Sequence, residues 1–224
     1  MDRSEFADWT KGSGLELTAP QLDAFERFAE ALYAANVVTN LTRVERGQVW
    51  LRHFADSVLF QDFIGQNNSV LDIGTGPGFP AWPLACARPD LKITALDSNA
   101  KMLGFLSTLP LVNLKVVNAR AEEWHKRESF NFVTGRAVAP LSAQLEISAA
   151  FCKIGGLLVP MRAASDAEMI GKVNLLPLGL RFSKTVERAL LGTVEKRLFP
   201  VFEKVQATKA GYPRQWAELK RNPL

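Results

Sequence analysis

The segment VLDIGTGPGFPAWPLA, residues 70–85, joins an apolar run to a helix-like run through a turn with three glycines. Gly74, Gly76 and Gly78 occupy every second position, shortly after the apolar run reaches Asp72. Glycine tolerates positive φ and lets a ligand approach the backbone closely. A helix after such a turn offers free N–H groups to a carboxylate or phosphate. The segment therefore predicts a strand, a ligand-binding loop and a helix in direct succession.

Strand and helix patterns alternate along the middle of the chain. The predicted strands are VLDIG, KITALD, LKVVNA, FNFVTG and GLLVPM, and the predicted helices are PAWPLACA, NAKMLGFLSTL and LSAQLEISAAF. Such alternation is typical of an α/β fold with a mostly parallel sheet covered on both faces. Two further strands, RFSKTVERA and KRLFPVFEKV, follow without a helix between them and predict an antiparallel edge. Pro200 would then lie at an edge or a bulge.

The N-terminal part of the chain has helical patterns only. Residues 18–36 keep one apolar face, and Thr18 and Gln21 fit a capping box at the start of that helix. Residues 49–63 repeat the pattern. We therefore expect a helical extension over residues 1–65, packed on a compact domain of residues 66–224.

The glycine spacing indicates which ligand the loop holds. A dinucleotide-binding fingerprint reads G-x-G-x-x-G, and its third glycine would fall where this chain has Phe79. The observed G-x-G-x-G, from Gly74 through Thr75 and Gly76 to Gly78, suits a ligand without a pyrophosphate. S-adenosylmethionine is such a ligand, and a nicotinamide dehydrogenase is the disfavoured alternative.

Two later features agree with a nucleoside ligand. Asp97 ends the second strand, where an acidic side chain can bind both ribose hydroxyls. The alternative is that Asp97, or equally Ser98, caps the next helix. The loop NARAEEW follows the third strand and would meet an adenine edge through Ala121 and Glu122. In this order the three elements predict the Rossmann-like fold of the class I S-adenosylmethionine-dependent methyltransferases.

Composition excludes several other classes. No apolar run approaches the roughly 18 residues of a membrane span, and the start lacks the apolar core of a signal peptide. Cys86 and Cys152 lie far apart in apolar surroundings, so we expect two buried thiols in a cytoplasmic protein. With only two histidines and two cysteines, a metal site is not expected.

The C-terminal third is basic. Residues 181–221 hold ten Lys or Arg and four Asp or Glu, a balance of +6, whereas the whole chain carries +4. This excess predicts an anionic partner, with nucleic acid first, unless it is an ordinary solvated face. The candidate phosphate contacts are Arg214, Lys220 and Arg221.

Six motifs, taken together, resemble one known family. They are NLTRVERGQVWLRHFADS, LDIGTGPGFP, LDSNAKMLGFL, NARAEEW, FNFVTGRAVAPL and YPRQWAELKRNPL. In this order they resemble the bacterial small-subunit ribosomal RNA guanine-N7 methyltransferases, also called glucose-inhibited division protein B. The resemblance covers nearly the whole chain. It implies S-adenosylmethionine as the cofactor, and methylation of a guanine N7 of 16S rRNA near the decoding region. The implied partner is that RNA or the 30S subunit, and we expect the protein to bind it as a monomer.

The resemblance also extends the predicted site. It favours a cofactor contact for Arg136, which ends the fourth strand, and it adds Arg52, Lys101 and Arg162 as RNA contacts. The chain departs from the family at Ala81, where glycine is usual, and at Met102 and Gly104, where basic residues are usual. These departures affect the RNA side more than the cofactor loop. The complete set of predicted cofactor contacts is Gly74, Thr75, Gly76, Gly78, Phe79, Asp97, Ser98, Ala121, Glu122 and Arg136.

The motif content also bears on the target atom. Exocyclic amine methylation often uses an Asp/Asn-Pro-Pro-aromatic loop after the fourth strand, but this loop reads TGRAVAP. Methylation at pyrimidine C5 needs a nucleophilic cysteine, and both cysteines lie in apolar helix patterns. A ring nitrogen such as guanine N7 has a free lone pair and needs neither group. The absence of an obvious acid/base pair agrees with that target.

Several candidate positioning side chains keep more than one interpretation. Arg136 could hold the cofactor carboxylate or the target guanine, or form a surface ion pair. His53 lies three residues before Asp56 on one helix face, where the pair could orient RNA or tie the N-terminal helices to the sheet. Asn40 could contribute to the same positioning, or only cap a helix.

Overall fold

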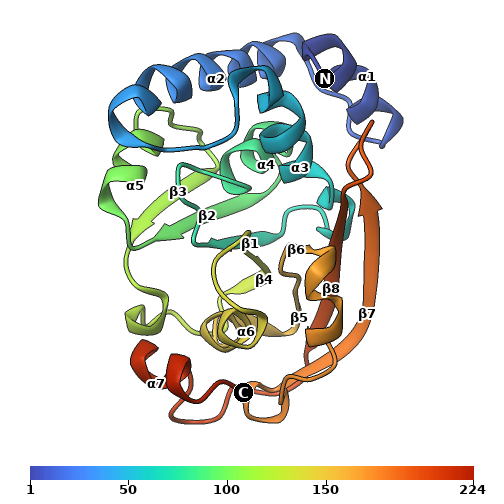
Figure 1. Ribbon diagram of the computed structural model, residues 1–224. Coiled ribbons are helices and arrows are strands. Elements are labelled where there is room, and N and C mark those ends of the chain that lie inside the picture. The colour runs from blue at the N-terminus through green and yellow to red at the C-terminus, as the bar shows by residue number, and fades with distance from the viewer.

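The computed structural model describes all residues, 1–224, and its central feature is one mixed sheet (Figure 1). The strand order is β3-β2-β1-β4-β5-β8-β6, and β7 pairs with β8. Strands β1 to β5 run parallel, whereas β8 is antiparallel to β5, β6 and β7. The strands are β1 (Ser69–Ile73), β2 (Lys92–Asp97), β3 (Leu114–Asn118), β4 (Phe130–Thr134), β5 (Cys152–Leu158), β6 (Arg162–Ala163), β7 (Leu180–Ala189) and β8 (Lys196–Lys204).

The antiparallel edge is confirmed, and Pro200 lies at a break within it. Pro200 pairs across to Thr185 of β7. On its other side, β8 pairs with β6 as far as Leu198 and with β5 from Phe202 onward. Proline has no N–H to donate, so the gap between these two pairings is a position where it costs no ladder hydrogen bond.

Helices cover both faces of the sheet, as the sequence predicts. In Figure 1, α2, α4 and α5 lie on one side, and α6 and α7 on the other. Each face has its own buried apolar cluster, one of 33 and one of 21 residues. The helices are α1 (Arg3–Gly12), α2 (Ala19–Thr39), α3 (Asp56–Val58), α4 (Ala81–Ala87), α5 (Ala100–Leu106), α6 (Leu141–Ala149) and α7 (Trp216–Arg221).

The N-terminal helices share their core with the sheet domain. Phe25 and Phe28 of α2 pack on Trp82 of α4, with ring centroids 5.6 and 4.4 Å apart. Phe6 of α1 packs edge-on against Phe25 at 5.2 Å. The Thr18 N–H donates to Gln21 Oε1 over 2.8 Å at the predicted helix start. A division of the chain at residues 65 and 66 stays a prediction. No helix of the structure, N-terminal or later, is both long and apolar enough to cross a membrane.

The predicted helix over residues 49–63 is wrong in type. Its first part, Trp50–Ala55, is π-helical, α3 supplies one turn, and Gln61–Phe63 is a 3₁₀ turn. Every residue from His53 to Phe60 is buried, so this segment has no solvent-facing stripe of the kind an amphipathic α-helix keeps. The wider π turn is a feature that often marks functional sites.

Candidate functional site

Two cavities meet at the carboxyl ends of the parallel strands. The glycine cavity, about 430 Å³, is lined by Gly74 and Gly76 and by residues after β2 and β3. The arginine cavity, about 520 Å³, is lined by four arginines and two aspartates, so its lining carries a net charge of +2. Ala137 and Val138 line both cavities. Ligands in open α/β sheets bind at this edge, so both cavities are where a site is expected.

The glycine loop is held in place by close packing and by Asp97. Gly74 has φ +69°, and a Cβ there would lie 2.9 Å from Val138 Cγ2. Gly76 has φ +58°, and its N–H donates to Asp97 Oδ2 over 2.8 Å. A Cβ on Gly76 would meet only Met102 Sδ, at 3.6 Å. Gly74 is therefore required by the protein's own packing, and Gly76 by its backbone conformation at the cavity wall.

Asp97 is a brace for the loop and not a helix cap. Its Oδ1 accepts the Asn99 N–H over 2.8 Å. Asn99 is the N-cap of α5, with its side chain accepting from the N–H groups of Lys101 and Met102. The capping alternative for Asp97 and Ser98 is thus wrong, because the N-cap is Asn99, two residues after Asp97 and one after Ser98. Both Asp97 and Ser98 line the glycine cavity, and a cofactor contact for each stays a prediction.

The predicted cofactor contacts divide into two groups. Ala121 and Glu122 line the glycine cavity beside Asp97. Thr75, Gly78 and Phe79 do not line it, and all three are buried behind the loop. A cofactor contact for these three residues stays a prediction, and their burial shows that they also pack the loop against the core. A Cβ on Gly78, for example, would lie 2.7 Å from Leu106 Cδ1.

Asp72, at the end of β1 directly before the glycine loop, lies beneath the cavities and does not line them. It is fully buried, and its Oδ2 accepts the Ala81 N–H at the start of α4 over 3.1 Å. Its Oδ1 and the Thr75 Oγ1 have no hydrogen-bond partner. Burial raises the pKa of the Asp72 carboxyl to about 7. The signal was present in the sequence, since an acidic residue inside an apolar strand directly before a glycine loop requires a reason to be buried.

The residues of the glycine cavity fit S-adenosylmethionine. The Asp97 carboxylate, partly exposed, is an acceptor for ribose hydroxyls, and Leu96, Met102 and Ile147 supply apolar walls for a purine. Gly76 leaves the loop backbone open on the cavity side. No cluster of three or more His, Cys, Asp or Glu side chains comes together anywhere in the chain.

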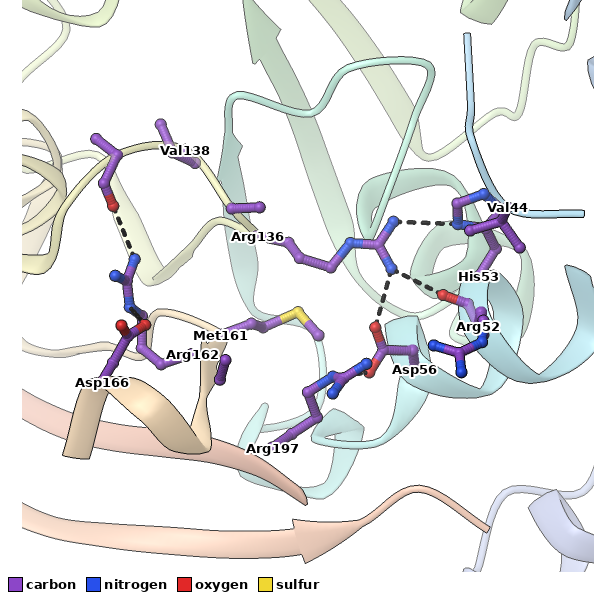
Figure 2. A pocket seen from close by; sticks show the side chains of 13 residues that line it. Val44, Arg52, His53, Asp56, Arg136, Val138, Met161, Arg162, Asp166 and Arg197 are labelled. Carbon is purple, nitrogen blue, oxygen red and sulfur yellow. Dashed lines mark hydrogen bonds and ion pairs between the residues drawn. The ribbon is translucent and has the colours of Figure 1, made fainter. Parts of the chain in front are cut away.

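Arg136 lies in the arginine cavity at the end of β4, and it does not line the glycine cavity (Figure 2). Its guanidinium donates to Asp56 Oδ2 over 3.1 Å and to the Arg52 carbonyl over 3.2 Å. Its Nη2 lies 3.3 Å from His53 Nδ1. These contacts tie the His53–Asp56 segment to the end of the sheet, which is one of the two interpretations given for that pair. A cofactor contact for Arg136 stays a prediction.

His53 is held as a neutral ring. Its imidazole stacks on Phe79 with centroids 4.0 Å apart, and its Nε2 lies 2.7 Å from Thr42 Oγ1. Burial, with a smaller contribution from the Arg136 charge, lowers the pKa of His53 to about 3. Both ring nitrogens have partners, so this histidine orients its neighbours and does not accept a proton near neutral pH.

Arg197 of β8 completes the network and was not predicted. Its Nε donates to Asp56 Oδ1 over 2.8 Å, so one buried carboxylate serves two guanidinium groups. Glu195 pairs with Arg52 at 2.7 Å from the same hairpin. Only the folded sheet brings β8 against the π-helical segment, and no spacing in the sequence signals that contact.

The predicted RNA contacts are distributed unevenly. Arg52 lines the arginine cavity, while Lys101, Lys220 and Arg221 are exposed. Arg162 lines the same cavity but is buried, and donates to the Ala139 carbonyl and to Gln144 Oε1, both over 2.8 Å. It also pairs with Asp166 at 2.9 Å. Arg162 is therefore held internally through Nη1 and Nε, and a phosphate contact for it stays a prediction.

Arg214 and Asn40 also have structural partners or positions that differ from the prediction. Arg214 is bound to the buried Glu146, with Nη2 2.6 Å from Oε2. It is therefore not available to RNA phosphates. Asn40 lies outside both cavities, is exposed, and ends α2 with φ +52°. The helix-capping alternative describes Asn40.

Comparison with known proteins agrees with this geometry. The model of the family described as rRNA small subunit methyltransferase G matches residues 21–178. A curated relative of that name from Leuconostoc citreum (strain KM20) is 36% identical over the full length of both chains. Another, from Lactobacillus helveticus (strain DPC 4571), is 37% identical over 93% of each chain.

Solved structures give the same fold at low identity. The crystal structure of M. jannaschii TYW2 in complex with AdoMet has a TM-score of 0.57 at 15% identity, covering 73% of this chain and 79% of the other. A SAM-dependent methyltransferase from Aquifex aeolicus has a TM-score of 0.55 at 17% identity, covering 71% of this chain and 94% of the other. The fold is therefore that of the class I methyltransferases. The chain itself belongs to the rRNA small subunit methyltransferase G family, whose members are S-adenosylmethionine-dependent enzymes.

Proposed function

We propose that this protein transfers a methyl group from S-adenosylmethionine to N7 of one guanine in 16S ribosomal RNA, near the decoding region. Membership of the family carries the methyltransferase activity and the small-subunit rRNA substrate. The atom, the region, a monomeric state and a cytoplasmic location are parts of the proposal. The single observation that carries the assignment of roles is that two cavities of different chemistry share Ala137 and Val138.

The glycine cavity is assigned to the cofactor. Asp97 would accept hydrogen bonds from the ribose hydroxyls, and the 3₁₀ turn Ala121–Glu123 would meet the adenine edge. The glycine loop would face the amino-acid end of the cofactor. When bound, S-adenosylmethionine supplies an electrophilic methyl group at the junction of the cavities.

The arginine cavity is assigned to the target base. A guanidinium can donate to guanine O6 on the edge that carries N7, which would orient the base and leave the neighbouring N7 lone pair free for the methyl group. Arg136 is fixed by three hydrogen-bond partners and lies over the Phe79 ring, 5.2 Å from its centroid. A guanidinium fixed in this way can orient a base without rearranging when the base arrives.

The chemistry of N7 fits a site without a proton acceptor. The N7 lone pair is free, so methyl transfer needs orientation of the two reactants more than it needs a base. His53, the only histidine in the cavity, has both ring nitrogens engaged and a pKa lowered to about 3. Asp56 is engaged by two arginines. The residues present therefore position the base and leave its protonation unchanged.

The junction between the cavities is conformationally constrained. Ala137 has φ +54°, which is uncommon for a residue with a Cβ. The preceding Gly135 leaves no room for a side chain, because a Cβ there would lie 2.6 Å from the Ile73 carbonyl oxygen. Strained backbone of this kind persists where the surrounding structure holds it, often at functional sites.

Two alternatives are tested together with the proposal. The protein could methylate a different RNA, or it could bind the cofactor and RNA without turnover. Purified protein should be incubated with tritiated S-adenosylmethionine in four separate reactions. Each reaction contains one substrate: 30S subunits, naked 16S rRNA, 23S rRNA or transfer RNA. We expect label in 16S rRNA alone. Label in another RNA would show that this other RNA is the substrate. Cofactor binding without any label would favour the alternative without turnover.

A further inference from the structure

Trp216 of α7 lines the glycine cavity. It shares that lining with Ala121 and Glu122, and with Ile147 of α6. In Figure 1, α7 lies close to α6, near the C-terminus of the chain. The basic charge of this tail predicts an RNA contact, but its only aromatic residue in the cavities faces the cofactor side.

A buried ion pair fixes the tail in this position. Glu146 of α6 is completely buried, and its Oε1 accepts from both the backbone N–H and the Nε of Arg214, over 2.9 and 2.8 Å. Its Oε2 accepts from Arg214 Nη2 over 2.6 Å. A buried carboxylate needs such partners, because an unpaired charge in the core costs several kcal/mol. Arg214 is thus committed to holding the tail on α6.

Further contacts hold the tail on either side of this pair. Arg127 Nη2 donates to the Tyr212 carbonyl over 2.8 Å. Leu219, three residues after Trp216, is buried in the apolar cluster around α6. Arg214 Nη1 donates to the Asn222 carbonyl over 3.0 Å, which closes the segment around α7. The segment that carries Trp216 is therefore held on both sides, at Tyr212 and Arg214 before it and at Leu219 and Asn222 after it.

We propose that Trp216 is an adenine-contacting residue of the cofactor site, and that the Glu146–Arg214 ion pair is the latch that holds it there. This inference rests on the proposed function, since it takes the glycine cavity to be the S-adenosylmethionine site. Trp216 lines the same cavity as Ala121 and Glu122, the two residues assigned to the adenine edge. Aromatic side chains stack on nucleobases through their π faces, whatever the base sequence.

The direct test measures S-adenosylhomocysteine binding by calorimetry in the wild type and three variants. Base–aromatic stacking is worth about 1–3 kcal/mol by alanine substitution, so Trp216→Ala should weaken binding at least about fivefold. Trp216→Phe should keep most of the affinity. Trp9→Ala is the matched control, because Trp9 packs against Phe6 of α1, away from both cavities, and its loss should leave affinity unchanged. Affinity within twofold of wild type in Trp216→Ala would overturn the inference.

Two further measurements keep the inference testable if that variant folds poorly. Tryptophan fluorescence should change on saturation with S-adenosylhomocysteine in the wild type, and much less in Trp216→Phe. An identical change in both proteins would contradict a ligand contact. Arg214→Gln should weaken binding although Trp216 is retained, and unchanged affinity there would overturn the latch.

The ligand adenosine separates this inference from the proposed function. It lacks the amino-acid end, so the loss on removing Trp216 should be about as large for adenosine as for S-adenosylhomocysteine. A wild-type protein that binds neither ligand would contradict the proposed function. A wild type that binds both, with Trp216→Ala binding both equally well, would contradict the role of Trp216 alone.

Discussion

Arg136 at the end of β4 lies 3.1 Å from Asp56 of the N-terminal helical segment, and the same carboxylate accepts from Arg197 of β8 at 2.8 Å. One buried carboxylate therefore joins three parts of the chain around the arginine cavity. The Arg136 side chain can occupy only the orientation that this carboxylate and the Arg52 carbonyl allow. In the proposed function, catalysis depends on orientation of the base, and this ion pair fixes the guanidinium that would orient it.

Replacing Arg136 tests that assignment. Arg136→Ala should lower methyl transfer to 30S subunits by about 100-fold, the size of effect that misplacing a reactant can have. Arg136→Lys should recover little, because an ammonium cannot reproduce a planar group with fixed donors. S-adenosylhomocysteine affinity should change less than turnover. Arg181→Ala is the control, since Arg181 is an exposed arginine of β7 paired with Glu203. Near-normal turnover in Arg136→Ala would show that Arg136 only forms a structural ion pair and does not orient the base.

Asp97 and Asn99 offer a matched pair at the glycine cavity. Asp97→Ala should weaken cofactor binding by about 1.5–3 kcal/mol, because a charged acceptor and the brace on Gly76 are both lost. Asn99→Ala removes the α5 cap and should cost about 1 kcal/mol of stability with affinity kept. Calorimetry and urea denaturation of both variants measure the two effects. The assignment fails if the variants exchange these effects, so that Asp97→Ala lowers stability alone.

Asp72 should give the protein a specific pH dependence. The folded pKa of about 7 lies above the ordinary value of 3.8, so between these values the native state binds a proton that the unfolded chain has released. The contribution of Asp72 to stability therefore falls as pH rises from about 4 to about 7. Asp72→Asn cannot titrate, yet keeps an acceptor for the Ala81 N–H. The difference in unfolding free energy, variant minus wild type, should rise across this window in urea titrations. A difference that stays level with pH would place the Asp72 pKa near its ordinary value.

The exposed end of the tail keeps its predicted link to RNA. Lys220 and Arg221 are exposed, whereas Arg214 is bound to Glu146. If both residues contact phosphates of single-stranded RNA, changing them to glutamine should reduce the log–log salt slope of RNA binding by roughly 1.4, at about 0.7 per contact. The slope should be measured by filter binding with 16S rRNA fragments from low to high salt. A slope identical to wild type would assign these side chains to a solvated surface.

The fold was largely predictable because its signals are local. The segment at residues 70–85, the acid at the end of β2 and the alternation of strands with helices each follow from neighbouring residues. They placed all five parallel strands, the antiparallel pair and the helices α2, α4, α5 and α6. The Gly76–Asp97 contact could also have been predicted, since the carboxyl ends of parallel strands lie at one edge of the sheet.

The remaining part of the site depends on contacts that no local pattern encodes. Arg197 reaches Asp56 across 141 residues, and Arg214 reaches Glu146 across 68. Charge counting treats these arginines as free, but the fold has paired them with buried carboxylates. The π-helical turn at Trp50–Ala55 was missed for a related reason, because burial on all sides overrides the amphipathic period that predicts an α-helix.

The central claim is that the arginine cavity presents guanine N7 to the cofactor, and the identity of the modified base tests it most directly. Unmethylated 30S subunits should be reacted with purified protein and S-adenosylmethionine. The 16S rRNA should then be treated with borohydride and aniline, which cleave the chain at 7-methylguanine, and the ends mapped by primer extension. We expect one new cleavage at a single guanine near the decoding region, absent with Arg136→Ala. Methyl incorporation without that cleavage, or cleavage unaffected by Arg136→Ala, would contradict the claim.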